Sequence, residues 1–171
     1  LKTTERHNIS NMATIEELKR ISSQVRRDIV RMVTTAKSGH PGGSLGITDV
    51  LTTLYFSEMK QDPKTWTRQA KDQDVFILSA GHLAPVYYSV LARAGYFPVS
   101  ELGTLRKFGS RLQGHPSVSD GLPGVTKPSG SLGQGLSVAA GIALGKKMDG
   151  TDRRVYCLCG DGENEEGQIW E

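Results

Sequence analysis

Apolar residues near the beginning of the chain recur at helical spacing. The repeat consists of Ile15, Leu18, Ile21, Val25, Ile29, Met32, Val33 and Ala36. Thr14 and Glu17 form a capping-box pattern before it, in which a hydroxyl and a carboxylate three residues apart satisfy free amides at a helix start. Gly39 and Pro41 predict that the helix ends near Lys37. The spacing therefore predicts one long helix.

Two short apolar runs have the length of strands. Residues 74–78 read Asp-Val-Phe-Ile-Leu and residues 154–158 read Arg-Val-Tyr-Cys-Leu, and both predict buried strands. Further helices are predicted at 47–59, from after His82 to about Ala94, at 101–108 with Ser100 as the cap, and at 132–148, with loops at 61–71 and 109–130. Strands that alternate with helices predict an α/β fold, a parallel sheet with helices on both faces. This domain would cover residues 14–171, behind a loose arm over residues 1–13.

Composition and charge exclude several classes of protein. The net charge of the 171 residues is only +3, and Lys and Arg are interspersed with acids, which argues against a nucleic-acid binder. No apolar stretch approaches the roughly 20 residues that a membrane span needs. The polar start of the chain has no secretory signal pattern, so we expect a cytoplasmic protein.

The two cysteines lie at the end of the second predicted strand. Alternation puts Cys157 and Cys159 on the same face of it. A C-x-C spacing alone is not typical of a zinc site. We therefore interpret both as buried thiols in a reducing compartment, in preference to a redox or metal role.

Unusual glycine motifs follow both predicted strands. Ligands of open α/β sheets bind beyond the carboxyl ends of the strands, which is where residues 79–82 and 160–162 fall. Glycines let backbone amides approach a phosphate, and a helix that begins near Glu163 would point its positive end at the same anion. Asp161 would repel a diphosphate unless a divalent cation such as Mg²⁺ bridged the two. The alternative is that Asp161 only caps a turn.

Three of the four histidines follow a glycine. His40, His82 and His115 each lie in a glycine-bounded loop, and two of them precede a proline. Imidazoles on stiff loops are suited to binding sugar hydroxyls, donating to phosphate or transferring protons near neutral pH. His7 lies in the polar arm, where a solvated side chain is the simpler interpretation.

Five motifs together resemble the transketolase family in identity, order and spacing. They are Ser-Gly-His-Pro-Gly-Gly at 38–43, Leu-Ser-Ala-Gly-His at 78–82, Gly-His-Pro at 114–116, Gly-Ser-Leu-Gly-Gln-Gly at 130–135 and Gly-Asp-Gly-Glu at 160–163. The resemblance covers about residues 14–171 and corresponds to the beginning of a transketolase. It implies a thiamine-diphosphate-binding fold, whose diphosphate-binding domain is here incomplete.

The resemblance also implies roles for single residues. His40 and His115 would hold the sugar close to the reacting carbon, and His82 would lie near the diphosphate and the donor's hydroxyls. Asp161 would bind Mg²⁺, or Ca²⁺ or Mn²⁺ in its place. The expected cofactor-binding residues are His82, Gly130, Ser131, Leu132, Gly160, Asp161, Gly162 and Glu163.

Two acidic residues near the end of the sequence match family positions that link paired active sites across a dimer interface. These are Glu166, which we also expect to be catalytic, and Glu171. The alternative is an exposed acidic first helical turn, which the helix dipole favours.

The sequence departs from the family pattern in places. Ala80 stands where many relatives have Lys, so that positive charge is missing from the phosphate site, and Ser131 replaces a frequent Pro. The family's second metal ligand, an Asn, and the carboxylate that activates the cofactor's aminopyrimidine both lie beyond Glu171. The chain therefore needs a pyrimidine-binding partner domain or partner chain, and we expect a dimer or heterotetramer. The abrupt ends favour either a split enzyme or a piece of a longer one.

The implied activity is transfer of a two-carbon ketol unit between sugar phosphates, as in the pentose phosphate pathway, with thiamine diphosphate and Mg²⁺. Two alternatives stay open. One is another thiamine-diphosphate enzyme on the same scaffold, such as a deoxyxylulose-phosphate synthase. The other is a non-catalytic assembly subunit that keeps the fold.

Overall fold

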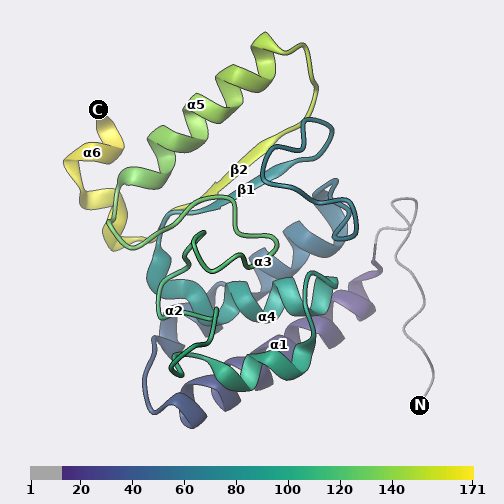
Figure 1. Cartoon of the computed structure of the whole chain (residues 1–171), viewed down its shortest axis with the longest axis vertical. Coiled ribbons are helices and arrows are strands. Elements are labelled where there is room, and N and C mark those ends of the chain that lie inside the picture. The colour runs from purple at the N-terminus through teal and green to yellow at the C-terminus, as the bar shows by residue number, and fades with distance from the viewer. Residues whose placement is uncertain (1–12) are drawn as a thin grey trace.

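The computed structural model describes residues 13–171, so the arm predicted over residues 1–13 lies almost wholly outside the described residues. Two parallel strands lie between a group of helices and one further long helix (Figure 1). In chain order the elements are α1 (Ile15–Ala36), α2 (Pro41–Gly46), α3 (Thr48–Thr53), the π-helical turn η1 (Leu54–Glu58), β1 (Val75–Leu78), the 3₁₀ turn η2 (Gly81–Leu83), α4 (Ala84–Ala94), the 3₁₀ helix η3 (Val99–Thr104), α5 (Gln134–Met148), β2 (Val155–Leu158), the 3₁₀ turn η4 (Gly162–Glu165) and α6 (Gly167–Trp170). None of the helices within residues 13–171 is both long and apolar enough to cross a lipid bilayer.

The predicted capping box at the start of α1 is confirmed. The Glu17 carboxylate accepts a hydrogen bond from the Thr14 amide at 2.8 Å, and the Thr14 hydroxyl accepts one from the Glu17 amide at 3.3 Å. These bonds satisfy donors that the first helical turn leaves free. The helix ends at Ala36, next to the predicted end, and Lys37 caps it with a left-handed φ of 49°.

The sheet confirms the predicted parallel α/β arrangement. β1 pairs with β2 in register, from Val75 opposite Val155 to Leu78 opposite Leu158. Alternate residues of a strand point to opposite faces. Phe76 and Leu78 accordingly belong to the cluster built on α1 and α4, whereas Val75 and Ile77 pack against α5. Helices therefore cover both faces of β1 (Figure 1).

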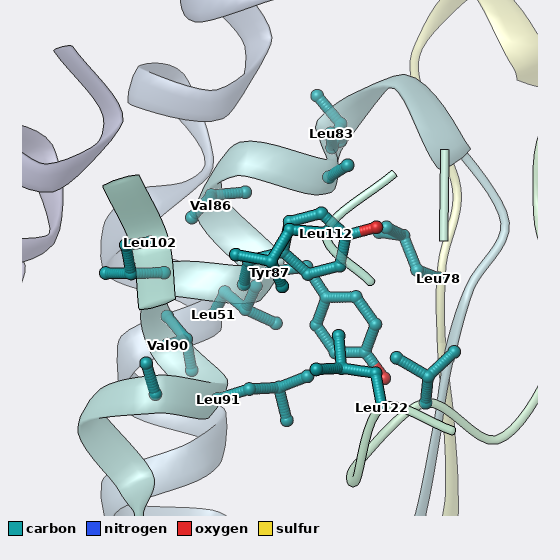
Figure 2. Packing of buried hydrophobic residues seen from close by; sticks show 14 of the residues in the cluster. Leu51, Leu78, Leu83, Val86, Tyr87, Val90, Leu91, Leu102, Leu112 and Leu122 are labelled. Carbon is teal, nitrogen blue, oxygen red and sulfur yellow. The ribbon is translucent and has the colours of Figure 1, made fainter. Parts of the chain in front are cut away.

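Helix α4 lies at the centre of the larger core, since every residue from Ala84 to Ala92 is buried. Figure 2 shows Tyr87 and Leu91 of this helix among leucines from other segments, including Leu112 and Leu122 of the long loop. The Tyr87 hydroxyl also donates to the carbonyl of Gly124 at 2.7 Å. The loop over residues 109–130 thus has no helix or strand, as predicted, but it is fixed by the core.

Three predicted helices differ from the observed ones. The helix expected at 47–59 begins earlier, because Pro41 has the fixed φ that suits a first helical position, and it divides into α2, α3 and η1. The helix expected at 101–108 is the shorter η3, which follows Pro98 and not a Ser100 cap. Helix α5 starts two residues later than predicted because Gly133 has a left-handed φ of 78°.

Strand β2 is more exposed than the prediction of a buried strand. All four of its residues, Cys157 among them, are partly exposed, and so is Cys159 just after the strand; the two cysteines are free thiols with their sulfurs 3.8 Å apart. Among the described residues β2 has a neighbouring strand on one edge only, so water still reaches its side chains. Desolvation, with a smaller contribution from Cys159, nevertheless raises the pKa of the Cys157 thiol to about 12, so this thiol is protonated at neutral pH.

An ion pair joins α1 to α4. Asp28, which is 5% exposed, accepts two hydrogen bonds from the Arg93 guanidinium, at 2.5 and 3.0 Å, and one from the Ser89 hydroxyl at 2.9 Å. Replacing one partner of a buried pair leaves the other without its bonds. The pair therefore fixes α4 against α1.

We predict that Asp28→Ala lowers the free energy of unfolding by about 3 kcal/mol, since the largely buried Arg93 loses its partner. The matched control is Asp49→Ala, which breaks the exposed pair with Arg26 and should cost below about 1 kcal/mol. Urea denaturation of both variants measures the difference. Equal losses of unfolding free energy in the two variants would show that the Asp28–Arg93 pair contributes no more to stability than the exposed pair.

Candidate functional site

The loops that follow the two strands lie side by side, as the parallel sheet predicted. The amide of Ser79 donates to the carbonyl of Leu158 at 2.9 Å, so the chain stays paired just beyond the end of β1. A Cβ placed on Gly160 would lie 3.4 Å from Cβ of Ala80 and 3.9 Å from the ring of His82. The two glycine motifs therefore share one edge of the sheet.

The structure brings the three Gly-His histidines together. The ring centroid of His40 lies 5.5 Å from that of His82 and 6.2 Å from that of His115. His40 precedes α2, His82 lies in η2, and His115 comes from the long loop over residues 109–130. Residues separated by more than 70 positions thus form one cluster at the carboxyl end of β1. Their catalytic roles stay predictions.

The segment that precedes α5 lies against this cluster. A Cβ on Gly81 would come 2.6 Å from the backbone carbon of Ser129 and 2.7 Å from the amide nitrogen of Gly130, so only glycine fits at position 81. A Cβ on Gly130 would lie 3.7 Å from the His115 ring. Residues 129–130 therefore contact both the loop of His82 and the loop of His115.

Arg106 is a site residue that the sequence did not reveal. Its guanidinium donates to the Ser38 hydroxyl at 3.1 Å and to the Gly114 carbonyl at 3.4 Å, and thus links the loops of His40 and His115. A Cβ on Gly114 would lie 2.6 Å from the guanidinium carbon. The one feature of the sequence that could have indicated this contact is the glycine before His115. Arg106 has a left-handed φ of 58°, which is rare outside glycine, and the sequence does not predict this conformation.

The pKa of His115 is lowered from its usual value. Desolvation is the main cause, followed by the positive charge of Arg106 and then by His40 and His82. Each of these disfavours the protonated imidazolium. At neutral pH the ring is therefore favoured in its neutral form, which can accept a proton or a hydrogen bond.

Glu163, predicted to bind the cofactor, has its carboxylate turned into the protein. The residue is 2% exposed. One carboxylate oxygen accepts hydrogen bonds from the Ser79 hydroxyl and from the Gly133 amide at 2.8 Å, and the other accepts from the Gly160 amide at 2.9 Å. The Ser79 hydroxyl in turn accepts from the Gly135 amide at 3.0 Å. This one side chain connects three segments of the site.

Asp161, two residues earlier, is exposed, and within the described part of the chain its side chain makes no capping hydrogen bond. Its carboxylate is therefore not used in the turn-capping role that was the alternative. No group of three or more His, Cys, Asp or Glu side chains within residues 13–171 is placed to hold a metal ion. A cation at Asp161 would need further ligands. The helix expected from Glu163 is only the short turn η4, so its dipole is smaller than predicted.

The remaining predicted residues line the outside of this edge. Gly130 and Ser131 are exposed and Leu132 is partly exposed. The hydroxyl of Ser129 is buried and has no hydrogen-bond partner among residues 13–171, so it is available to a ligand. The exposed Asp161 and Gly162 lie at the same edge, so backbone and hydroxyl groups of the kind that bind a diphosphate are available there, whereas Asp161 supplies only one of the ligands that a divalent cation needs. Glu166 and Glu171 flank α6 and are exposed, and their roles stay predictions.

The chain is similar to known proteins over most of its length. The family model described as "Transketolase, thiamine diphosphate binding domain" matches residues 18–171. A transketolase of Pongo abelii is 42% identical over 161 residues, which cover 92% of this chain and 25% of that protein. One subunit of an apulose-4-phosphate transketolase from Actinobacillus succinogenes is 41% identical over 157 residues, which cover 91% of this chain and 56% of that protein.

The fold is also similar to a solved structure. The crystal structure of a transketolase from Campylobacter jejuni superposes with a TM-score of 0.83 at 32% identity, over 92% of this chain and 26% of that one. The chain thus spans about a quarter of the transketolases that it matches, and a little more than half of the apulose-4-phosphate transketolase subunit.

We predict that Arg106→Gln raises the pKa of His115, because a positive charge that opposes protonation is removed. NMR titration of the histidine rings measures this value. Lys107→Gln is the matched control, since Lys107 is exposed and is not among the charges that lower the His115 pKa. A His115 pKa that falls or stays constant in the Arg106 variant would contradict the assignment.

Proposed function

Because this chain belongs to the transketolase family, we propose that it forms the diphosphate-binding part of an enzyme that transfers a two-carbon ketol unit from a ketose phosphate to an aldose phosphate. The observation that carries the proposal is the cluster of His40, His82 and His115 beside the Gly-Asp-Gly loop, at the carboxyl edge of a parallel sheet.

The cofactor of this reaction would be thiamine diphosphate with Mg²⁺. When bound, thiamine diphosphate supplies stabilisation of carbanion character at the reacting carbon. Asp161 would hold the cation, and Gly162 with the segment Gly130–Leu132 would bind the diphosphate through backbone groups. The free hydroxyl of Ser129 supports the same assignment, because it offers a donor or acceptor that the protein itself does not use.

The histidines would act on the sugar. His40 and His82 have N–H groups suited to binding hydroxyls and a developing alkoxide. His115, which desolvation and Arg106 keep in its neutral form, would accept the proton of a sugar hydroxyl as the neighbouring carbon–carbon bond breaks. When the aldose is joined, the same imidazolium would return that proton to the new alkoxide.

A pyrimidine-binding domain or partner chain would complete the enzyme. The support is that the chain spans only part of its relatives, one of which is itself named as a subunit of a transketolase. We propose a dimer or heterotetramer in the cytoplasm, with sugar phosphates of the pentose phosphate pathway as substrates. The exposed Glu166 and Glu171 would lie at the interface between paired sites.

We predict that Asp161→Ala weakens thiamine diphosphate binding by about 100-fold or more, because the variant lacks a metal ligand. Calorimetry with Mg²⁺ present, on the protein assembled with its completing domain or partner chain, measures the affinity. Cys157→Ser is the control, since this thiol packs toward α5 and should leave the affinity unchanged. Equal affinities in the two variants would contradict the metal assignment.

A second prediction concerns the substrates. The assembled enzyme should convert a ketose phosphate and an aldose phosphate, and it should not condense pyruvate with glyceraldehyde phosphate. Following both product pairs in parallel assays separates ketol transfer from deoxyxylulose-phosphate synthesis. Product from the pyruvate pair alone would overturn the proposed reaction, and no turnover with any pair would favour an assembly role.

A further inference from the structure

The buried carboxylate of Glu163 accepts hydrogen bonds from three segments of the candidate site. We propose that Glu163 is a positioning residue that fixes three loops in the arrangement that a diphosphate requires, and that it contacts neither the metal nor the cofactor. We name the hydrogen-bonded group the Glu163 clasp; its members are Glu163, the hydroxyl of Ser79 and the amides of Gly133, Gly135 and Gly160. The inference rests on the proposed function for the identity of the ligand.

The clasp connects segments that are far apart in the sequence. Ser79 follows β1, Gly133 precedes α5 and Gly160 follows β2. Glu163 reaches all three through hydrogen bonds, two of them 2.8 and 2.9 Å long, and Ser79 extends the group to Gly135 at 3.0 Å. Each of these segments is continuous with a motif predicted to bind the cofactor or the sugar.

The carboxylate has little capacity left for a metal ion. It is 2% exposed, and both of its oxygens already accept hydrogen bonds. A cation would have to displace the buried amide of Gly133 or the partly buried amide of Gly160, and an amide left buried without a partner costs about 1–3 kcal/mol. Asp161, in contrast, is exposed and has no capping bond. The two neighbouring carboxylates therefore have different tasks.

The charge of Glu163 is balanced by dipoles. No ion pair to this residue is found among the described residues, so neutral donors must stabilise the carboxylate. Gly133 is the N-cap of α5, a helix of 15 residues, and its amide points at the carboxylate. The positive end of the helix dipole favours a negative charge there. The clasp thus needs an anionic acceptor at position 163.

Close packing restricts which residues can occupy the positions of the Glu163 clasp. A Cβ on Gly135 would lie 2.3 Å from the Ser79 hydroxyl, so α5 approaches β1 only because position 135 is glycine. Glu163→Gln keeps the side-chain shape, but it replaces one acceptor oxygen with an NH₂ group that faces N–H or O–H donors. At least one hydrogen bond and the charge are then lost without a large cavity.

The test measures thiamine diphosphate affinity by calorimetry at saturating Mg²⁺, on the protein assembled with its completing domain or partner chain. Glu163→Gln should weaken binding by about 10- to 100-fold, the usual effect of losing a group that orients ligands. Asp28→Asn is the matched control, because it also alters a buried, hydrogen-bonded carboxylate but lies in the α1–α4 contact. It should lower stability and leave the affinity unchanged.

Hydrogen exchange without any ligand gives an independent readout. In Glu163→Gln the amides of Gly133 and Gly160 should exchange faster than in the unsubstituted protein, while amides of α4 keep their protection. Ser79→Ala should weaken cofactor binding less, and its effect should be less than additive with that of Glu163→Gln, because both remove parts of one group.

Three outcomes would overturn the proposal. The first is unchanged cofactor affinity in Glu163→Gln with only a lower stability, which is a purely structural role. The second is weaker binding with unchanged exchange at Gly133 and Gly160, which indicates a direct ligand. The third is an equal loss of affinity in Asp28→Asn. If the unsubstituted protein binds no thiamine diphosphate, the proposed function fails, and the exchange at Gly133 and Gly160 alone decides whether the clasp orders these loops.

Discussion

The candidate site depends on loops that approach one another with almost no side chain between them. Position 81 lies against the backbone of residues 129–130, and position 135 lies against Ser79, at distances that exclude even a Cβ. Such contacts bring backbone amides of several segments to one edge of the sheet, where an anion can meet them. Because the approach is so close, a change in one loop alters the position of the others.

Packing in the hydrophobic core also fixes the positions of these loops. Helix α4 begins directly after η2, which carries His82, and its buried residues fix the direction in which that turn leaves the sheet. The Tyr87 hydroxyl binds the Gly124 carbonyl, so the long loop of His115 is attached to the same helix. The histidine cluster is therefore positioned by packing that lies outside the site, as rigid scaffolds generally position functional loops.

Local patterns in the sequence predicted the features that depend on neighbouring residues. The capping box before α1 and the short apolar run of β1 were read correctly, and the glycine motifs after the strands meet as parallel pairing requires. The inward turn of Glu163 could not be predicted, because its partners Gly133 and Ser79 are 30 and 84 positions away. Arg106 was missed for the same reason, since its partner Ser38 is 68 positions away.

The two carboxylates of the Gly-Asp-Gly-Glu motif differ in burial. Within one short turn, Glu163 is buried among amide donors and Asp161 is exposed. A carboxylate satisfied by N–H groups and a helix end has its charge already compensated, so it does not strongly oppose an incoming diphosphate. An exposed carboxylate without such donors repels an anion and attracts a cation. Arg106, which lies beside the loops of His40 and His115, supplies positive charge, and desolvation keeps His115 available as a proton acceptor. An anionic ligand held at Asp161 through a cation would thus meet the backbone dipoles of these loops and, at His115, an imidazole that can accept a proton.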